Sequence, residues 1–410
     1  MKTQRIFYGW WITIAASLGL STSPGQFAFG ALGLFMIPLT IEFDAPRAEV
    51  ALASTFFTIA LAITSPFIGK VADRYGSKQI LIPSLLIFGI LLASIAFIVT
   101  ALWQLYVIFV LIGVFAAGAN GLPYMRIIGE WFNKRRGLAL GIAMAGGGAG
   151  YMYVPPMLQH IIDNYSWRHG YYALAAIVLF AALPVSYFFL RNTPQEMGLN
   201  PDNDNLEKIP EKPAEQKILF KDIITQKTFW VLYLIFALLS FCLYGLLSNL
   251  VPMLIDRGME NSSAANVAAT LGLAILVSRA VIGYFLDRFF APRVAIVSIL
   301  LSTIGVVMLA MSIVGVPAYL AALLIGLSIG TEFDLLAYLT TRYFGLSSFG
   351  MVYGLMFSAF LVGTSFGPPT FGASFDQYGS YINVLTLCSA LLIVSVGLFL
   401  LLPKYKFDAE

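Results

Sequence analysis

Long apolar runs separated by short polar loops recur along the whole of this 410-residue chain. A helix needs about 20 consecutive apolar residues to cross a bilayer core, where every backbone polar group must be satisfied within the protein. The runs have this length, so we expect an all-α membrane protein with twelve transmembrane helices. The predicted spans are 10–40, 48–69, 79–99, 102–128, 137–162, 168–191, 228–256, 262–285, 293–313, 316–343, 347–374 and 380–402.

The composition leaves little room for other kinds of protein. Hydrophobic residues make up 59% of the chain and charged residues 11%, far from the mix of a soluble domain. The basic residues lie in loops and do not line one polar face, which argues against a nucleic-acid partner. Cys242 and Cys388 lie inside apolar runs, so we expect no disulfide, metal or other cofactor. Without a nucleophile–base pair or a phosphate-binding loop in the sequence, neither an enzyme nor an ATP-driven pump is expected.

The distribution of Lys and Arg over the short loops predicts the orientation in the membrane. With a cytoplasmic N-terminus, only Arg47, Arg168 and Arg257 fall on the outer side. Fourteen fall on the cytoplasmic side: Lys2, Arg5, Lys70, Arg74, Lys78, Arg126, Lys134, Arg135, Arg136, Arg288, Arg293, Arg342, Lys404 and Lys406. We therefore predict a multi-pass protein of the inner (plasma) membrane with both termini in the cytoplasm. The first apolar run is too long for a cleaved signal peptide, so we interpret it as the first span.

The two halves of the sequence repeat at a nearly constant offset. The proline pair 155–156 recurs in the second half as 368–369, and Pro38 recurs at almost the same offset as Pro252. The polar segment 192–227 holds four prolines and too few apolar residues to span or fold alone. We predict two six-helix pseudo-symmetric bundles, over 1–191 and 228–410, joined by a cytoplasmic linker over 192–227. Parallel repeats of this kind are typical of transporters, which bind substrate between the repeats near the bilayer midplane.

The end of the second predicted span and the loop after it contain a glycine, followed four residues later by an aspartate and an arginine: Gly69, Asp73 and Arg74. This loop resembles the signature of the major facilitator superfamily, and a shorter copy, with Asp287 and Arg288, stands at the equivalent place in the second half. The resemblance implies a cytoplasmic gate, in which the aspartate caps a neighbouring helix and the arginine pairs across the seam. A positive-inside loop with a helix cap explains the charges but not their recurrence. The predicted gating residues are Gly69, Asp73, Arg74, Arg126, Glu130, Asp287 and Arg288, of which Arg126 and Glu130 form an i, i+4 pair.

Three further segments narrow the resemblance. The first span opens with Gly9-Trp10-Trp11, and the fifth is entered through 131–150, which runs from Trp-Phe-Asn-Lys-Arg-Arg into a glycine-rich stretch. Together with 192–201, these segments are similar to bacterial monocarboxylate porters and oxalate/formate antiporters, and the resemblance spans the whole chain. Phe7-Tyr8 replaces the acidic residue of that family before the Gly-Trp, and the first helix has no lysine. Ile275 stands where mammalian members carry an acid, so proton coupling does not transfer residue by residue.

Three formal charges, Arg279, Glu332 and Asp334, lie well inside predicted spans. Each costs at least about 2.5–3.5 kcal/mol at the bilayer centre, so each needs a partner and is a functional candidate. At a rise of about 1.5 Å per residue, all three lie about 12–15 Å from the cytoplasmic ends of their helices. Glu332 and Asp334 are two residues apart and point to nearly opposite faces, so we expect only one to face Arg279.

We interpret Arg279 as the ligand of a substrate carboxylate, because its planar fork binds such groups with two hydrogen bonds. Glu332 or Asp334 would then carry the proton. The alternatives are a permanent ion pair of Arg279 with one acid, and a structural cluster of Asp334 with Tyr338. The other candidates for the substrate site share a matching depth or an aromatic ring: Asn120, Gln26, Tyr124, Tyr338, Tyr151, Tyr353 and Phe360. For Gln26, a packed polar kink in the first span is the alternative.

These features predict a secondary active transporter that carries a small monocarboxylate such as lactate or pyruvate, by proton symport and alternating access. The resemblance implies that a dicarboxylate porter of this group carries a second cation in the eleventh span, but the predicted span 347–374 contains no Lys, Arg or His. One buried arginine for one carboxylate therefore favours a monoanion. Exchange of the oxalate/formate type and proton-coupled efflux of another organic solute are the alternatives. The expected partners are a small organic acid anion, a proton and the lipid bilayer, and we expect a monomer.

Overall fold

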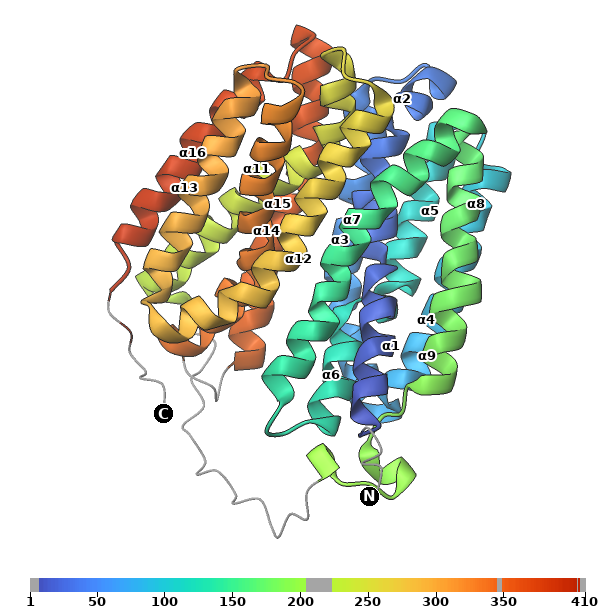
Figure 1. The fold of residues 1–410 in the computed structure, drawn as a ribbon, viewed down its shortest axis with the longest axis vertical. Coiled ribbons are helices and arrows are strands. Elements are labelled where there is room, and N and C mark those ends of the chain that lie inside the picture. Colours follow the sequence, from blue (N-terminus) through green and yellow to red (C-terminus); the bar gives the residue numbers. More distant parts are fainter. Residues whose placement is uncertain (1–6, 204–222, 345–348, 404, 406–410) are drawn as a thin grey trace.

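The structure, a computed structural model, describes residues 7–203, 223–344, 349–403 and 405. The side chains of Pro66, Gly69, Lys70, Asp73, Asn203, Ala280, Gly283, Asp287, Phe349 and Gly350 lie outside this description. All elements within the described ranges are helices (Figure 1). Eleven helical segments there are long and apolar enough to cross a membrane, and α5 is a shorter apolar helix.

The helices fall into two consecutive groups along the chain. The first comprises α1 (Gly9–Ser21), η1 (Gly25–Gly30), α2 (Leu32–Phe43), α3 (Arg47–Tyr75), α4 (Ser77–Ile98), α5 (Leu102–Phe115), η2 (Ala117–Ala119), α6 (Gly121–Trp131), α7 (Arg136–Asn164), α8 (Trp167–Ile177), η3 (Val178–Ala182) and α9 (Leu183–Phe189). Two short turns, η4 (Pro194–Met197) and η5 (Pro201–Asn203), follow it. The second comprises α11 (Lys227–Asp256), α12 (Asn261–Arg288), α13 (Ala291–Ala310), α14 (Val316–Phe344), α15 (Phe349–Tyr378) and α16 (Ile382–Leu400).

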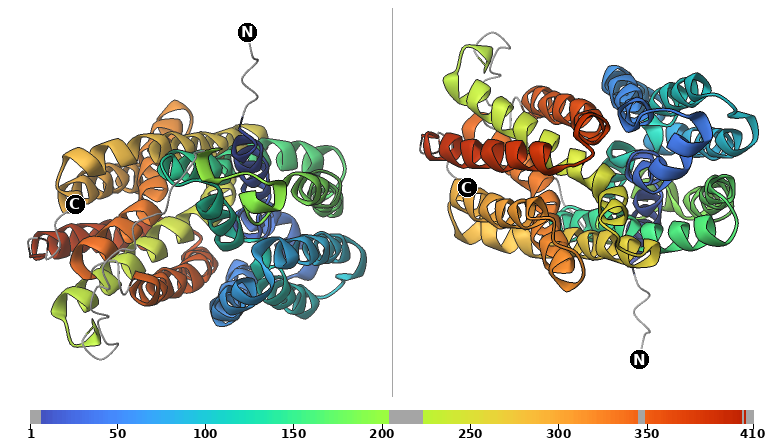
Figure 2. Two further views of the ribbon diagram at one scale, coloured as in Figure 1. Left: turned by 90° about the horizontal axis from the view of Figure 1, so that it is seen from below. Right: turned by 90° about the horizontal axis from the view of Figure 1, so that it is seen from above.

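These two groups form two bundles that lie side by side (Figure 1), and the end-on views separate them clearly (Figure 2). The prediction of an all-α fold of two six-helix bundles is therefore confirmed. We call the end where α1 begins the basic end, because Arg74, Lys78 and Arg288 lie at the helix ends there. The opposite end, with the α2–α3 and α11–α12 turns, is called the distal end.

The fourth span is broken, whereas the sequence predicts one continuous helix over 102–128. The helix stops at Phe115, passes through the 3₁₀ turn η2 and restarts at Gly121, with Asn120 in an extended conformation between them. Pro123 lacks the N–H that would bond back to the carbonyl of Ala119, so a continuous helix would lose a hydrogen bond at this point. The local sequence therefore interrupts the backbone ladder near mid-depth.

The first span is also interrupted, at the polar segment that the sequence marks as a possible kink. The hydroxyls of Ser21 and Thr22 donate to the carbonyls of Leu18 and Gly19 at 2.8 and 3.1 Å. Pro24 then removes a backbone donor, and the chain continues as the π-helical segment η1. The widened turn places Gln26 against α7.

At the distal end, Arg47 at the start of α3 joins the two bundles. Its guanidinium forms an ion pair with Asp256 at the end of α11 and a hydrogen bond with the Tyr381 hydroxyl. Asp376, near the end of α15, accepts hydrogen bonds from the backbone N–H groups of Arg47 and Ala48 at 3.0 and 2.8 Å. A carboxylate at a helix N-terminus satisfies unpaired N–H groups and interacts favourably with the helix dipole. The second bundle thus caps a helix of the first.

A related contact lies at the symmetry-equivalent place. Asp163, at the end of α7, precedes Asp376 by the same offset that separates the two proline pairs. It accepts a hydrogen bond of 2.9 Å from the side-chain amide of Asn261, the first residue of α12. We call these two contacts, Asp376 with the start of α3 and Asp163 with the start of α12, the distal latches. The duplication therefore extends to how the bundles meet.

The space around individual glycines shows how closely the two bundles approach each other at different depths, because an added Cβ would collide wherever the packing is tight. A Cβ on Gly148 of α7 would lie 2.7 Å from the backbone of Leu276 on α12, and a Cβ on Gly272 would collide with the backbone of Tyr151. Nearer the basic end, a Cβ on Gly141 of α7 or Gly354 of α15 would meet no atom within 4 Å. The bundles therefore pack tightly near mid-depth, while these parts of α7 and α15 border open space.

Candidate functional site

The Arg279 side chain extends from α12 to the other bundle. Its Nη1 donates a hydrogen bond of 3.2 Å to the backbone carbonyl of Met144 on α7. The guanidinium carbon lies 5.7 Å from the centre of the Phe333 ring. Within the described part of the chain, Arg279 forms no ion pair and its buried Nε has no hydrogen-bond partner. The permanent ion pair considered from the sequence is thus not found among the described residues.

Groups from four other helices surround this charge. Asp334 of α14 and Tyr353 of α15 interact electrostatically with Arg279, and so do Tyr151 of α7 and Tyr244 of α11. The sequence predicts three of these four residues for the site, and the structure brings all three to the same arginine. The group combines both bundles, so its geometry depends on how they are placed relative to each other.

Glu332 points elsewhere, into the second bundle. Its Oε1 accepts a hydrogen bond of 2.7 Å from the Ser240 hydroxyl on α11, and its side chain is buried. The other carboxyl oxygen, Oε2, is buried without a partner among the described residues. Of the two acids on α14, Asp334 interacts electrostatically with Arg279, and Glu332 accepts the hydrogen bond from Ser240.

Gln26 lies beside Tyr151 at the first-bundle side of this site. Its amide donates a hydrogen bond of 3.3 Å to the carbonyl of Gly147, and its oxygen accepts one from Ser23. The Tyr151 hydroxyl donates to the carbonyl of Gly25 at 3.2 Å. Gln26 therefore holds the η1 segment against α7 in this structure.

An aromatic cluster borders the second-bundle side. The Phe360 ring lies 4.8 Å from Phe333, 4.9 Å from Tyr244 and 5.4 Å from Phe357, measured between ring centres. Phe357 stacks in turn on Tyr353 at 6.4 Å. Phe360 thus contacts Phe333 and Tyr244, which themselves neighbour Arg279.

Three other predicted site residues lie apart from this group. Tyr124 is fully buried and packs against Gly19 of α1 inside the first bundle. Asn120 ends the break in the fourth span, and its buried Nδ2 has no partner among the described residues. The Tyr338 hydroxyl accepts a hydrogen bond of 2.7 Å from Arg342, one turn closer to the basic end.

The predicted gating residues lie at the basic end. Arg126 and Glu130 line a cavity of about 170 Å³ together with Gly76 and Asn192. The Arg74 and Arg288 guanidinium groups lie over the rings of Tyr75 and Tyr284 at 5.4 and 4.3 Å. The side chains of the remaining three, Gly69, Asp73 and Asp287, fall outside the described residues.

Sequence reasoning missed the α11 face of the site. Ser240 and Tyr244 are four residues apart, so they lie on one face of an otherwise apolar helix, followed after one more turn by Ser248. This polar stripe at helical spacing is the signal that could have found them. The distal contacts of Arg47, Asp256 and Asp376 have no comparable local signal.

Comparison with known proteins places these observations in a family. A family model described as Major Facilitator Superfamily matches residues 18–368. Monocarboxylate transporter 11 of Homo sapiens is 25% identical over 413 residues, covering 97% of this chain and 83% of that protein. The Escherichia coli protein named Uncharacterized MFS-type transporter YhjX is 25% identical over 369 residues, covering 86% and 85% of the two chains.

The fold has a solved counterpart. A bacterial homolog of the human lysosomal transporter Spinster, in an inward-facing and unoccupied conformation, superimposes with a TM-score of 0.71 at 17% identity. The match covers 98% of this chain and 97% of the other. For a metal ion, the described residues provide no group of three His, Cys, Asp or Glu side chains. The motifs, the paired bundles and the matched family model agree, and the chain belongs to the Major Facilitator Superfamily.

Proposed function

We propose that this protein is a secondary active transporter of a small monocarboxylate, such as lactate or pyruvate, coupled to protons by symport. The observation that carries the proposal is the Arg279 guanidinium at the bundle interface, which has no ion pair among the described residues. The similarity to human monocarboxylate transporter 11 supports the same class of substrate. The protein acts as a monomer with domains over 1–191 and 228–410 and a linker over 192–227.

Substrate binding follows from the chemistry of the arginine. A guanidinium presents paired N–H donors that match the two oxygens of a carboxylate. Nη1 already donates to Met144, whereas Nε is buried and unpartnered, so a carboxylate would complete its hydrogen bonding. One guanidinium binds one carboxylate, which favours a monoanion over a dianion.

Proton coupling follows from charge balance around Arg279. Without substrate, the charge of an ionised Asp334 offsets that of Arg279. A bound carboxylate would leave one excess negative charge in a low-dielectric site, and such a charge is costly near the membrane centre. Protonation of Asp334 restores neutrality, so substrate and proton are taken up together. We assign the proton to Asp334 and a structural role to Glu332, which pairs with Ser240.

The transport cycle alternates access between the two ends. We assign the basic end to the cytoplasm, from the excess of Lys and Arg in its loops, with the protein in the inner membrane. Gly69, Asp73, Arg74, Arg126, Glu130, Asp287 and Arg288 would gate this end. The distal latches would hold the outer end shut while substrate leaves to the cytoplasm.

Uptake of labelled lactate into proteoliposomes that contain the purified protein tests the proposal. An inward proton gradient should stimulate uptake, and unlabelled pyruvate should compete more strongly than oxalate. Uptake that needs a preloaded anion would instead indicate an exchanger of the oxalate/formate type. Inhibition by organic cations and not by carboxylates would favour efflux of another solute, with Asp334 as counter-charge.

A further inference from the structure

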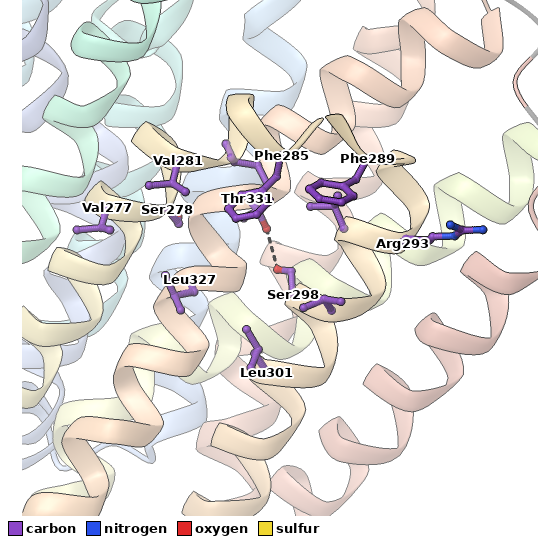
Figure 3. A pocket seen from close by; sticks show the side chains of 13 residues that line it. Val277, Ser278, Val281, Phe285, Phe289, Arg293, Ser298, Leu301, Leu327 and Thr331 are labelled. Carbon is purple, nitrogen blue, oxygen red and sulfur yellow. Dashed lines mark hydrogen bonds between the residues drawn. The ribbon is translucent and has the colours of Figure 1, made fainter. Parts of the chain in front are cut away.

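A separate groove lies on the outer side of the second bundle, between α12, α13 and α14 (Figure 3). Its volume is about 450 Å³, and nine of the thirteen residues that line it are apolar, among them Val281, Phe285 and Leu301. Arg279 is not among its lining residues, so the groove is distinct from the candidate substrate site. No step of the proposed transport cycle uses it.

The groove opens sideways, toward the membrane. Val281, Phe285 and Val297 line it and are also 43%, 41% and 58% exposed, so their outer faces meet whatever surrounds the protein. The lining residues lie on or next to α12, α13 and α14, each of which contains a segment long and apolar enough to cross a membrane, so we expect lipid and not water around them. A groove with apolar walls that opens toward lipid is best filled by an apolar group.

The hydroxyl groups in the wall are already satisfied. Ser298 and Thr331 bond each other at 2.9 Å, as the dashed line in Figure 3 marks. Ser278 donates to the carbonyl of Ile275 at 3.1 Å. The three hydroxyls among the described lining residues are therefore already bonded within the protein, which fits a hydrocarbon chain better than a polar solute.

The length of the groove and the positive charge at its mouth indicate which molecule would supply such a hydrocarbon chain. From Val277 on α12 to Phe289, the residue that directly follows this helix, the lining extends about 18 Å at 1.5 Å per residue, close to the roughly 15 Å thickness of one leaflet's hydrocarbon. Arg293 lies at the basic end of the lining and is exposed, with its guanidinium pointing away from the apolar side chains in Figure 3. A cation at this level attracts the phosphate of an anionic lipid.

We propose that this groove binds an acyl chain of an anionic phospholipid from the leaflet at the basic end, with the lipid headgroup on Arg293. The test uses the full chain in phosphatidylcholine nanodiscs with a small fraction of phosphatidylglycerol that carries a photoreactive group in one acyl chain. The matching phosphatidylcholine probe serves as the comparison. Crosslinks are located on α12–α14 peptides by mass spectrometry.

The expected result is groove labelling by the phosphatidylglycerol probe that exceeds the phosphatidylcholine probe by about fivefold. Val281→Trp fills the groove and should abolish the labelling by both probes. Val307→Trp, on a lipid-facing position of α13 outside the groove, should not. Arg293→Gln should equalise the two probes, and Arg293→Lys should keep their difference.

Equal labelling of Val281→Trp and Val307→Trp would overturn the groove as the binding site. Equal labelling of the unmodified protein by the two probes would overturn the anionic headgroup. Thermal melting of each variant checks its folding, and Val297→Trp replaces Val281→Trp if the latter does not fold. The readout is independent of transport, so it stands even if the proposed function fails.

Discussion

At the scale of single residues, the side chain at position 279 is the most direct test of carboxylate binding, because a planar guanidinium and a point charge bind carboxylates differently. Arg279→Lys should raise the Kd for lactate about ten- to a hundredfold, since one of two charge-assisted hydrogen bonds is lost. Binding to purified protein by calorimetry measures the change. Arg191→Lys, which loses only bonds to nearby carbonyls, is the matched control. An unchanged Kd for Arg279→Lys would contradict the carboxylate assignment.

Substitutions of the two acids of α14, Asp334 and Glu332, should differ in how lactate uptake responds to a proton gradient. Asp334→Asn permanently mimics the protonated acid, so we expect exchange of internal for external lactate to persist. Its uptake should no longer rise with an inward proton gradient. Glu332→Gln keeps a partner for Ser240 and leaves Asp334 intact, so its stimulation by the gradient should remain. The opposite pattern, measured in the same proteoliposomes, would move the proton to Glu332.

At the scale of elements, helix ends join the two bundles. Asp376→Asn removes the charge that caps α3 but keeps one acceptor oxygen, so the closed distal end should lose about fivefold in population. Distances between spin labels at Tyr165 and Met311, both well exposed at the distal end, report this equilibrium. Glu42→Gln is the control, because Glu42 pairs with Arg168 inside the first bundle only. Equal effects of the two variants would show that Asp376 does not latch the bundles.

At the scale of the whole molecule, alternating access requires the basic halves of α7 and α15 to close. Gly141→Leu and Gly354→Leu place side chains in open space, so folding and the melting temperature should be unaffected. Each should abolish most lactate uptake, because the new side chain obstructs closure. Gly397→Leu adds the same side chain in equally open space on α16 and should transport normally. Normal uptake by the Gly354 variant would argue against closure at this position.

Local sequence determined much of this protein. Apolar runs of bilayer length specify the spans, because a backbone in lipid has few other ways to satisfy its polar groups. The offset repeats specify two related bundles, and counting residues from helix ends puts Arg279 and Asp334 at similar depth. Pro123 and Pro24 mark the two interruptions, although the break in the fourth span went unpredicted.

Which of the charged side chains contact one another depends on the packing of the helices in three dimensions. Helical spacing shows that Glu332 and Asp334 point in different directions, but the rotation of α14 is set by its packing, chiefly against α12 and α13. That rotation turns Asp334 toward Arg279 and Glu332 toward Ser240. The pairing of Arg47 with Asp256 joins two residues from different halves of the chain, and no local pattern encodes it. Membrane insertion fixes depth along each helix, whereas contacts between helices depend on how the finished bundles fit together.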